Sequence, residues 1–300
     1  VSNAMKNSLC FIGSNNLYSQ VALRTLLAKN VYVSQIIFAD FAPAKIPDNR
    51  LPINHGACSP EKIHIPMLAA RHSIPIHYAG NDIKKFSAWK HFPHETPPNY
   101  LFVACFPSRL PTALIQWPNK LAINLHPSLL PAYRGPDPLF WQLKSGESNT
   151  GFSLHVLTES LDSGAILSQK TVRFPQGATR DELDTLLAQK GAEALYELLS
   201  TADPSFDKTE QDPASATYQT LPQTEDFTIN THWSAERAYN FIRGTHTPTY
   251  GYPILLGGKQ YHLAYALEYE PLRSLDKEYL QLDNKILIQF SPGVLQVKPV

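Results

Sequence analysis

The segment INLHPSLLPAYRG, residues 123–135, decides the fold prediction because it joins a strand to a loop that carries polar side chains. Residues 121–125 form a short apolar run that is typical of a buried strand, and alternate side chains of a strand share a face. Asn124 and His126 therefore point the same way from the end of this strand. Two prolines and a glycine then interrupt regular structure, which predicts a loop over residues 128–135.

This pattern places groups of complementary chemistry where ligands bind in α/β proteins, at the carboxyl ends of parallel strands. An asparagine amide can donate a hydrogen bond to a developing oxyanion, and a histidine can move a proton near neutral pH. Asp162, in the segment LDSGAI of residues 161–166, can orient that histidine and stabilise its charged form. Taken singly, Asn124, His126 and Asp162 are more economically explained as a turn residue, a surface histidine and a loop carboxylate. Their combination with the SLLPAYRG loop favours a catalytic site.

The first half of the chain predicts a βαβ unit. An apolar strand at residues 8–13, a helix at 18–29 and a strand at 31–39 follow one another, which implies a crossover and a parallel sheet. A further strand is expected at 100–105. The turn at Gly13 lacks the G-x-G-x-x-G pattern, so no dinucleotide cofactor is expected. The prediction is an α/β fold with a Rossmann-like, mostly parallel sheet and helices on both faces.

The second half predicts the end of this domain and a smaller β-rich one. Two more strands are expected at residues 152–157 and 165–172, and the T-R-D-E sequence ending at Glu182 has the spacing of a capping box for a helix that continues to about residue 200. Polar residues and prolines then indicate a linker, and short alternating runs follow a helix near 234–243. The predicted organisation is a catalytic domain (5–203), a linker (204–223) and a small, OB-like, β-rich C-terminal domain (224–300).

Residues 121–170 resemble a known family. The quoted loop, Trp141, the Gly146-Glu147 and Thr150-Gly151 pairs and the 162–166 segment are similar to formyltransferases that use N10-formyltetrahydrofolate. That family includes methionyl-tRNA formyltransferase, glycinamide ribonucleotide formyltransferase and the formyltransferases of amino sugars. Glycinamide-type enzymes fit less well because they end after one domain and lack the Tyr-Arg-Gly form of the loop.

The resemblance implies a role for each part of the site. Asn124, His126 and Asp162 correspond to the catalytic triad of the family, and N10-formyltetrahydrofolate is the expected formyl donor. The loop after the strand at 100–105 helps to hold the folate in this family. The residues implied there are Phe106, Pro107, Ser108 and Arg109. The expected substrate loop comprises Ser128, Tyr133, Arg134 and Gly135. Two roles stay open for Arg134: meeting an acidic group of the substrate, as Tyr133 could, or tying the loop to a carboxylate.

Composition bounds the remaining possibilities. The 300 residues carry no formal net charge, so nothing global indicates a polyanion-binding protein. Three cysteines without a C-x-x-C pair favour a reduced, cytoplasmic setting, and no apolar run is long enough for a membrane span. His55, Cys58 and His64 have a spacing that invites a zinc site, but no fourth ligand lies nearby and prolines interrupt them, so no metal is expected.

The acceptor is predicted from charge. From residue 224 onward the chain has seven Lys and Arg against eight Asp and Glu. The tRNA branch of the family carries a basic loop after its second strand, whereas residues 40–50 here read DFAPAKIPDNR. Because phosphate contacts dominate nucleic-acid affinity, we expect a small amine, in particular an amino sugar linked to a nucleotide, with methionyl-tRNA as the alternative. A formyltetrahydrofolate hydrolase and a non-catalytic binding protein of the same fold are further alternatives.

Overall fold

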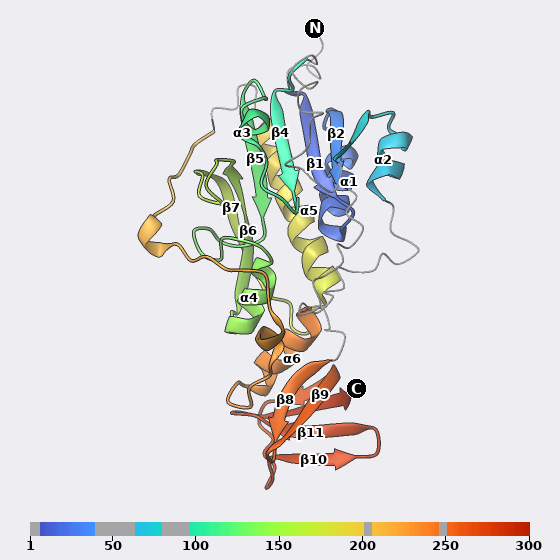
Figure 1. The fold of residues 1–300 in the computed structure, drawn as a ribbon, viewed down its shortest axis with the longest axis vertical. Helices are drawn as coiled ribbons and strands as arrows, with labels where there is room; N and C mark the ends of the chain where they lie inside the picture. Colours follow the sequence, from blue (N-terminus) through green and yellow to red (C-terminus); the bar gives the residue numbers. More distant parts are fainter. Residues whose placement is uncertain (1–6, 40–63, 80–95, 201–205, 246–250) are drawn as a thin grey trace.

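A computed structural model of the protein describes residues 7–39, 64–79, 96–200, 206–245 and 251–300 (Figure 1). It contains a seven-stranded sheet of order β3-β2-β1-β4-β5-β6-β7 and a five-stranded sheet of order β10-β11-β12-β9-β8. The first sheet comprises β1 (Leu9–Ser14), β2 (Val33–Ala39), β3 (Ile76–Ala79), β4 (Tyr100–Ala104), β5 (Leu121–His126), β6 (Asn149–Val156) and β7 (Ile166–Arg173). The second comprises β8 (Tyr252–Leu256), β9 (Lys259–Glu270), β10 (Tyr279–Leu282), β11 (Lys285–Gln289) and β12 (Val294–Pro299). The helices are α1 (Leu17–Ala28), α2 (Ile65–Arg71), α3 (Thr112–Ile115), α4 (Pro138–Ser145), α5 (Arg180–Leu199) and α6 (Ala235–Gly244).

The first sheet has the predicted α/β character. Strands β1 to β5 run parallel, β6 is antiparallel to β5, and β7 is antiparallel to β6. All pairings in the second sheet are antiparallel. The predicted fold class, a mostly parallel sheet with helices plus a small β-rich part, is therefore confirmed. Among the described residues, no helix is long and apolar enough to cross a membrane.

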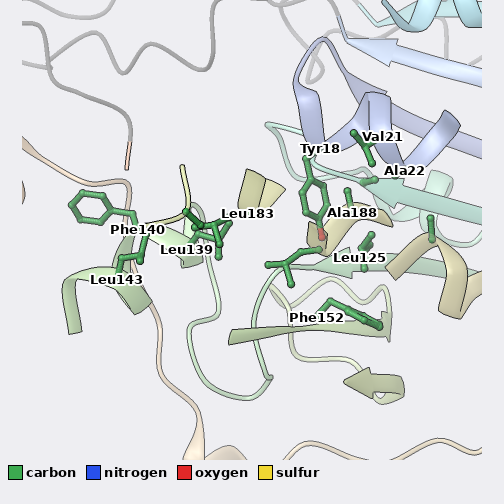
Figure 2. Close-up of a cluster of buried hydrophobic side chains, with 14 of the residues drawn as sticks. Tyr18, Val21, Ala22, Leu125, Leu139, Phe140, Leu143, Phe152, Leu183 and Ala188 are labelled. Atoms are coloured by element: carbon green, nitrogen blue, oxygen red, sulfur yellow. The ribbon is translucent and has the colours of Figure 1, made fainter. Parts of the chain in front are cut away.

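Strand β5 separates a packed face from the face that carries its polar residues. Ile123 and Leu125 are buried in the main core together with side chains of α1 and α5, and Figure 2 shows Leu125 beside Tyr18 and Ala188. Asn124 and His126 point to the opposite face because side chains alternate along a strand. That opposite face also holds Val103 and Ala122, next to α3. The core therefore fixes β5 from behind and leaves its polar face for the site.

Two elements that the sequence analysis did not predict belong to this frame. Helix α4 packs against α6, so it joins the two sheets through a continuous core. Its side chains Phe140 and Leu143 are buried in this core. Strand β8 contains Pro253, and a proline within a short apolar run normally indicates that the run is not a central strand. The proline is tolerated because β8 is an edge strand of its sheet.

The segment predicted as a linker contacts the first sheet and its loops at several of its described residues. We call residues 206–223 the strap; it passes outside β7 and then crosses toward α6 (Figure 1). Thr209 exchanges two backbone hydrogen bonds with Ile166 of β7, at 2.8 and 2.9 Å. Further along, the Arg134 N–H donates to the Thr217 carbonyl and the Gln219 N–H donates to the Arg134 carbonyl, at 2.9 and 2.8 Å. The strap is thus joined to both the edge strand and the predicted substrate loop. The predicted loop at 40–50, together with His55 and Cys58, lies outside the described residues.

Helix α5 approaches β5 closely at Gly191, and this contact yields a prediction. A Cβ at this position would lie 2.2 Å from Cδ1 of Leu125, which is 2% exposed and cannot easily move. Gly191→Ala should therefore lower the free energy of unfolding by about 1–3 kcal/mol, the usual range for overpacking, although alanine favours helix more than glycine. Urea denaturation measures the change. The exposed neighbour Lys190→Ala is the control, and an unchanged or raised stability for Gly191→Ala would contradict the close packing.

Candidate active site

The predicted triad converges on the polar face of β5, where a fourth side chain joins it. Asn124 pairs with His155 across the antiparallel β5–β6 ladder, so the two side chains share a face. The Asn124 Nδ2 lies 3.0 Å from His155 Nε2. The Asp162 carboxylate lies between two imidazoles: Oδ2 is 3.7 Å from His126 Nδ1, and Oδ1 is 3.6 Å from His155 Nε2. The structure thus brings Asn124, His126 and Asp162 together, and it adds His155, which the sequence analysis missed.

Asp162 is held in place by a backbone donor of the 128–135 loop. The Gly135 N–H donates to Asp162 Oδ2 at 2.9 Å. Asp162 has a φ of 49°, in the left-handed region that a non-glycine residue occupies only when its surroundings hold it there. Its side chain is 9% exposed, so the carboxylate is largely removed from water. A buried anion of this kind needs the donors that surround it.

The hydrogen bonds indicate which nitrogen carries the proton in each imidazole. A carbonyl oxygen only accepts, so His126 Nε2, at 2.9 Å from the Tyr133 carbonyl, is the protonated nitrogen and Nδ1 is the basic one. By the same argument His155 donates from Nδ1 to the Val156 carbonyl at 3.0 Å. His155 Nε2 then accepts from the Asn124 amide. One amide hydrogen of Asn124 is used in this way, and the other has no partner among the described residues.

Burial and charge act in opposite directions on the two titrating groups. Burial lowers the pKa of His126 below its ordinary value, and the Asp162 carboxylate and the Tyr133 carbonyl oppose this fall without cancelling it. Burial raises the pKa of Asp162, but the charge of His126, the contact with His155 and the Gly135 N–H outweigh burial and hold this pKa well below its usual range. At neutral pH the site therefore contains an ionised carboxylate beside a neutral histidine. That is the protonation state in which His126 can accept a proton.

The four residues of the predicted substrate loop make different contacts. Ser128 is fully buried, and its hydroxyl donates to the Ala132 carbonyl at 2.7 Å. The Tyr133 hydroxyl donates to Glu147 at 2.6 Å, and its carbonyl binds His126. Gly135 has a φ of 103°, and a Cβ there would lie 2.3 Å from the Gln219 carbonyl oxygen of the strap. Only glycine allows this approach.

Arg134 ties the loop to the strap. Its side chain is 4% exposed, and its Nε and Nη2 donate to Oε1 of Gln211 at 3.1 and 2.7 Å. Its Nη1 donates to the Tyr218 hydroxyl at 2.6 Å. Of the two roles left open by the sequence, these contacts match the tethering role, with the difference that the partner is a neutral amide and not a carboxylate.

The strand β4, which pairs with β5, is followed after Cys105 by the predicted folate-binding residues Phe106, Pro107, Ser108 and Arg109. They therefore lie at the carboxyl end of the neighbouring strand. Phe106 is half-buried and packs against the hydrophobic cluster that contains Val103 and Ala122, whereas Arg109 is exposed.

Comparisons with known proteins show which family the chain resembles. Residues 58–199, which contain the whole triad, match the family model described as formyl transferase. The resemblance to the formyltransferase family is confirmed. A methionyl-tRNA formyltransferase of Synechococcus sp. (strain JA-3-3Ab) is 34% identical over 181 residues, which is 59% of this chain and 55% of the relative. The chain thus spans little more than half the length of this curated relative.

Two solved structures share the fold over nearly the whole chain. The N-formyltransferase of Helicobacter canadensis, in complex with folinic acid and dTDP-3-aminofucose, has a TM-score of 0.68 at 16% identity and covers 98% of this chain and 99% of its own. The methionyl-tRNA formyltransferase of Clostridium thermocellum has a TM-score of 0.52 at 13% identity, with coverage of 98% and 99%. At these identities the likeness shows the fold alone.

The direction of the His126 shift can be tested by NMR titration. The imidazole of His126 should titrate below the ordinary pKa of about 6.5. The substitution Asp162→Asn should lower the pKa of His126 further, because the Asp162 carboxylate favours the charged imidazolium. Because the folded-state pKa is depressed, the contribution of His126 to stability is complete above about pH 6.5 and is lost as the pH falls through its folded value. A pKa above 6.5 in the wild type would contradict the described environment.

Proposed function

We propose that this chain transfers a formyl group from N10-formyltetrahydrofolate to a primary amine. The observation that carries the proposal is the convergence of Asn124, His126 and Asp162 on one strand face, within a region that matches the formyl transferase family. Solved structures of this fold contain folinic acid in the H. canadensis protein and tetrahydrofolic acid in HypX of Aquifex aeolicus, which supports a folate donor.

The proposed chemistry assigns one task to each side chain. The amine nitrogen attacks the formyl carbon, and the carbonyl oxygen becomes an oxyanion in a tetrahedral intermediate. The unused amide hydrogen of Asn124 stabilises that oxygen, because donors aimed at developing charge lower the barrier most. His126 accepts the proton that the attacking amine loses and returns a proton to N10 as the carbon–nitrogen bond to folate breaks. Asp162 stabilises the imidazolium that forms between these steps.

The folate is proposed to lie along the residues after β4. Phe106 offers an aromatic surface for a ring system, and Arg109 offers a cation for the glutamate carboxylates of the donor. This position is beside β5, so a donor held there can present its formyl group to Asn124.

Substitution of the triad tests the mechanism. Asn124→Ala and His126→Ala should each lower the turnover number by about 10²–10³-fold, the usual cost of removing one such group. Circular dichroism should show an unchanged fold, and Lys190→Ala serves as an active surface control. Near wild-type turnover in either variant would refute the assignment. Release of formate at the same rate with and without an amine would favour the alternative of a hydrolase.

For the acceptor, methionyl-tRNA has the stronger support from sequence, because curated relatives such as the Synechococcus protein carry that name. This support runs against the preference for a small amine that charge alone suggested. A nucleotide-linked amino sugar is the second candidate, and the observation in its favour is the C-terminal region with eight acidic and seven basic residues. Such a region offers few contacts to phosphates.

The two acceptors can be separated in one assay. We expect the protein to formylate methionyl-tRNA, and we expect its affinity for this tRNA to fall only gently between about 50 and 200 mM salt. The slope of log affinity against log salt is about −0.7 to −0.9 for each neutralised phosphate, and the C-terminal region offers few such contacts. Transfer is measured with radiolabelled formyl donor, with uncharged tRNA as the control. No transfer to methionyl-tRNA, together with transfer to dTDP-3-aminofucose, would favour the second candidate.

A further inference from the structure

The strap contributes one side chain whose polar atoms all face the loops of the site. Gln211 uses both amide hydrogens, because Nε2 donates to the carbonyl of Asp162 at 2.9 Å and to that of Gly164 at 2.7 Å. Its Oε1 accepts from Nε and Nη2 of Arg134. The amide therefore bridges the loop that carries Asp162 and the loop of residues 128–135.

The two bridged loops both contribute to the placement of His126 and Asp162. The 128–135 loop provides the Tyr133 carbonyl to His126 and the Gly135 N–H to the Asp162 carboxylate. The other loop holds Asp162 itself, at a positive φ that its surroundings must maintain. A bridge between these loops consequently fixes the separation of His126 and Asp162.

The contact also requires an amide. A glutamate at position 211 would keep an acceptor for Arg134, but it would place an oxygen against two carbonyl oxygens. An alanine would remove both halves of the bridge. The side chain is matched to its partners in number and in kind of hydrogen bond.

We infer that Gln211 is a positioning residue, which acts from the strap through Asp162 on the formyl transfer proposed above. The inference rests on that proposed function for its kinetic test, but its geometric content concerns only the distance between Asp162 and His126. The strap is then more than a connection between two sheets, because its Gln211 side chain positions Asp162.

The test compares Gln211→Glu and Gln211→Ala with Gln219→Ala. Gln219 lies on the same strap and contacts Arg134 through its backbone, and its side chain has no hydrogen bond among the described residues, so it is a matched control. We expect both Gln211 variants to lose about 10- to 100-fold in turnover number with little change in the KM for the folate donor, as a small misplacement of a catalytic group does. Gln219→Ala should retain wild-type turnover.

A second readout does not depend on activity. NMR titration should show a lower pKa for His126 in Gln211→Ala, because a displaced Asp162 favours the imidazolium less; the groups that face this imidazole are Asp162 and His155. In Gln211→Glu the added negative charge favours the imidazolium and opposes this fall, so that variant is judged by its turnover number. Gln211→Glu retains the anchor to Arg134, so it tests the inference even where Gln211→Ala unfolds. Wild-type turnover in Gln211→Glu, or an unchanged His126 titration in folded Gln211→Ala, would overturn the inference. Failure of the wild type to transfer formyl groups would refute only the proposed function, since the titration would still report on the bridge.

Discussion

The carboxylate of Asp162 is a buried anion, and the rest of the site is arranged around it. The Gly135 N–H donates to it and two imidazoles flank it, and without such partners its burial would cost several kcal/mol. Because these partners come from β5, β6 and the 128–135 loop, accommodating one charge fixes three separate segments relative to one another. The neutral state of His126 follows from the same burial, so the protonation pattern and the packing of the site have a common origin.

The sheet supplies rigidity to this arrangement from its opposite face. Ile123 and Leu125 alternate with Asn124 and His126, and they are locked against α1 and α5. A polar side chain on such a strand keeps its direction because its apolar neighbours cannot rotate out of the core. Gly191 brings α5 against Leu125, directly behind Asn124 and His126. Core packing and the geometry of the proposed catalytic site are therefore properties of the same six-residue strand.

Local sequence patterns predicted those parts of the fold and of the triad that depend on residues close together in the sequence. Alternation on β5 placed Asn124 and His126 on one face, and the capping box at Thr179 predicted the start of α5. The chemistry of a carboxylate suggested the role of Asp162 and the resemblance matched it to the family's triad, but no local pattern gives its distance from His126. His155 was missed because its place depends on the antiparallel register of β6 on β5, which two separate apolar runs do not specify. Strand β8 was missed because Pro253 is acceptable only at a sheet edge.

The strap shows most clearly why a polar, proline-rich segment is difficult to interpret from sequence. Its composition is that of a linker, and its order comes from pairing with groups far away in the chain: Thr209 with Ile166, Gln211 with Arg134, and Gln219 with the 128–135 loop. Arg134 was open to two roles for the same reason, since only the folded chain shows that its guanidinium is buried against Gln211 and Tyr218. A segment that leaves the catalytic sheet on its way to the C-terminal sheet thus crosses both loops that hold Asp162. On the inference drawn for Gln211, the path of the chain between its two sheets also sets the geometry of the proposed catalytic site.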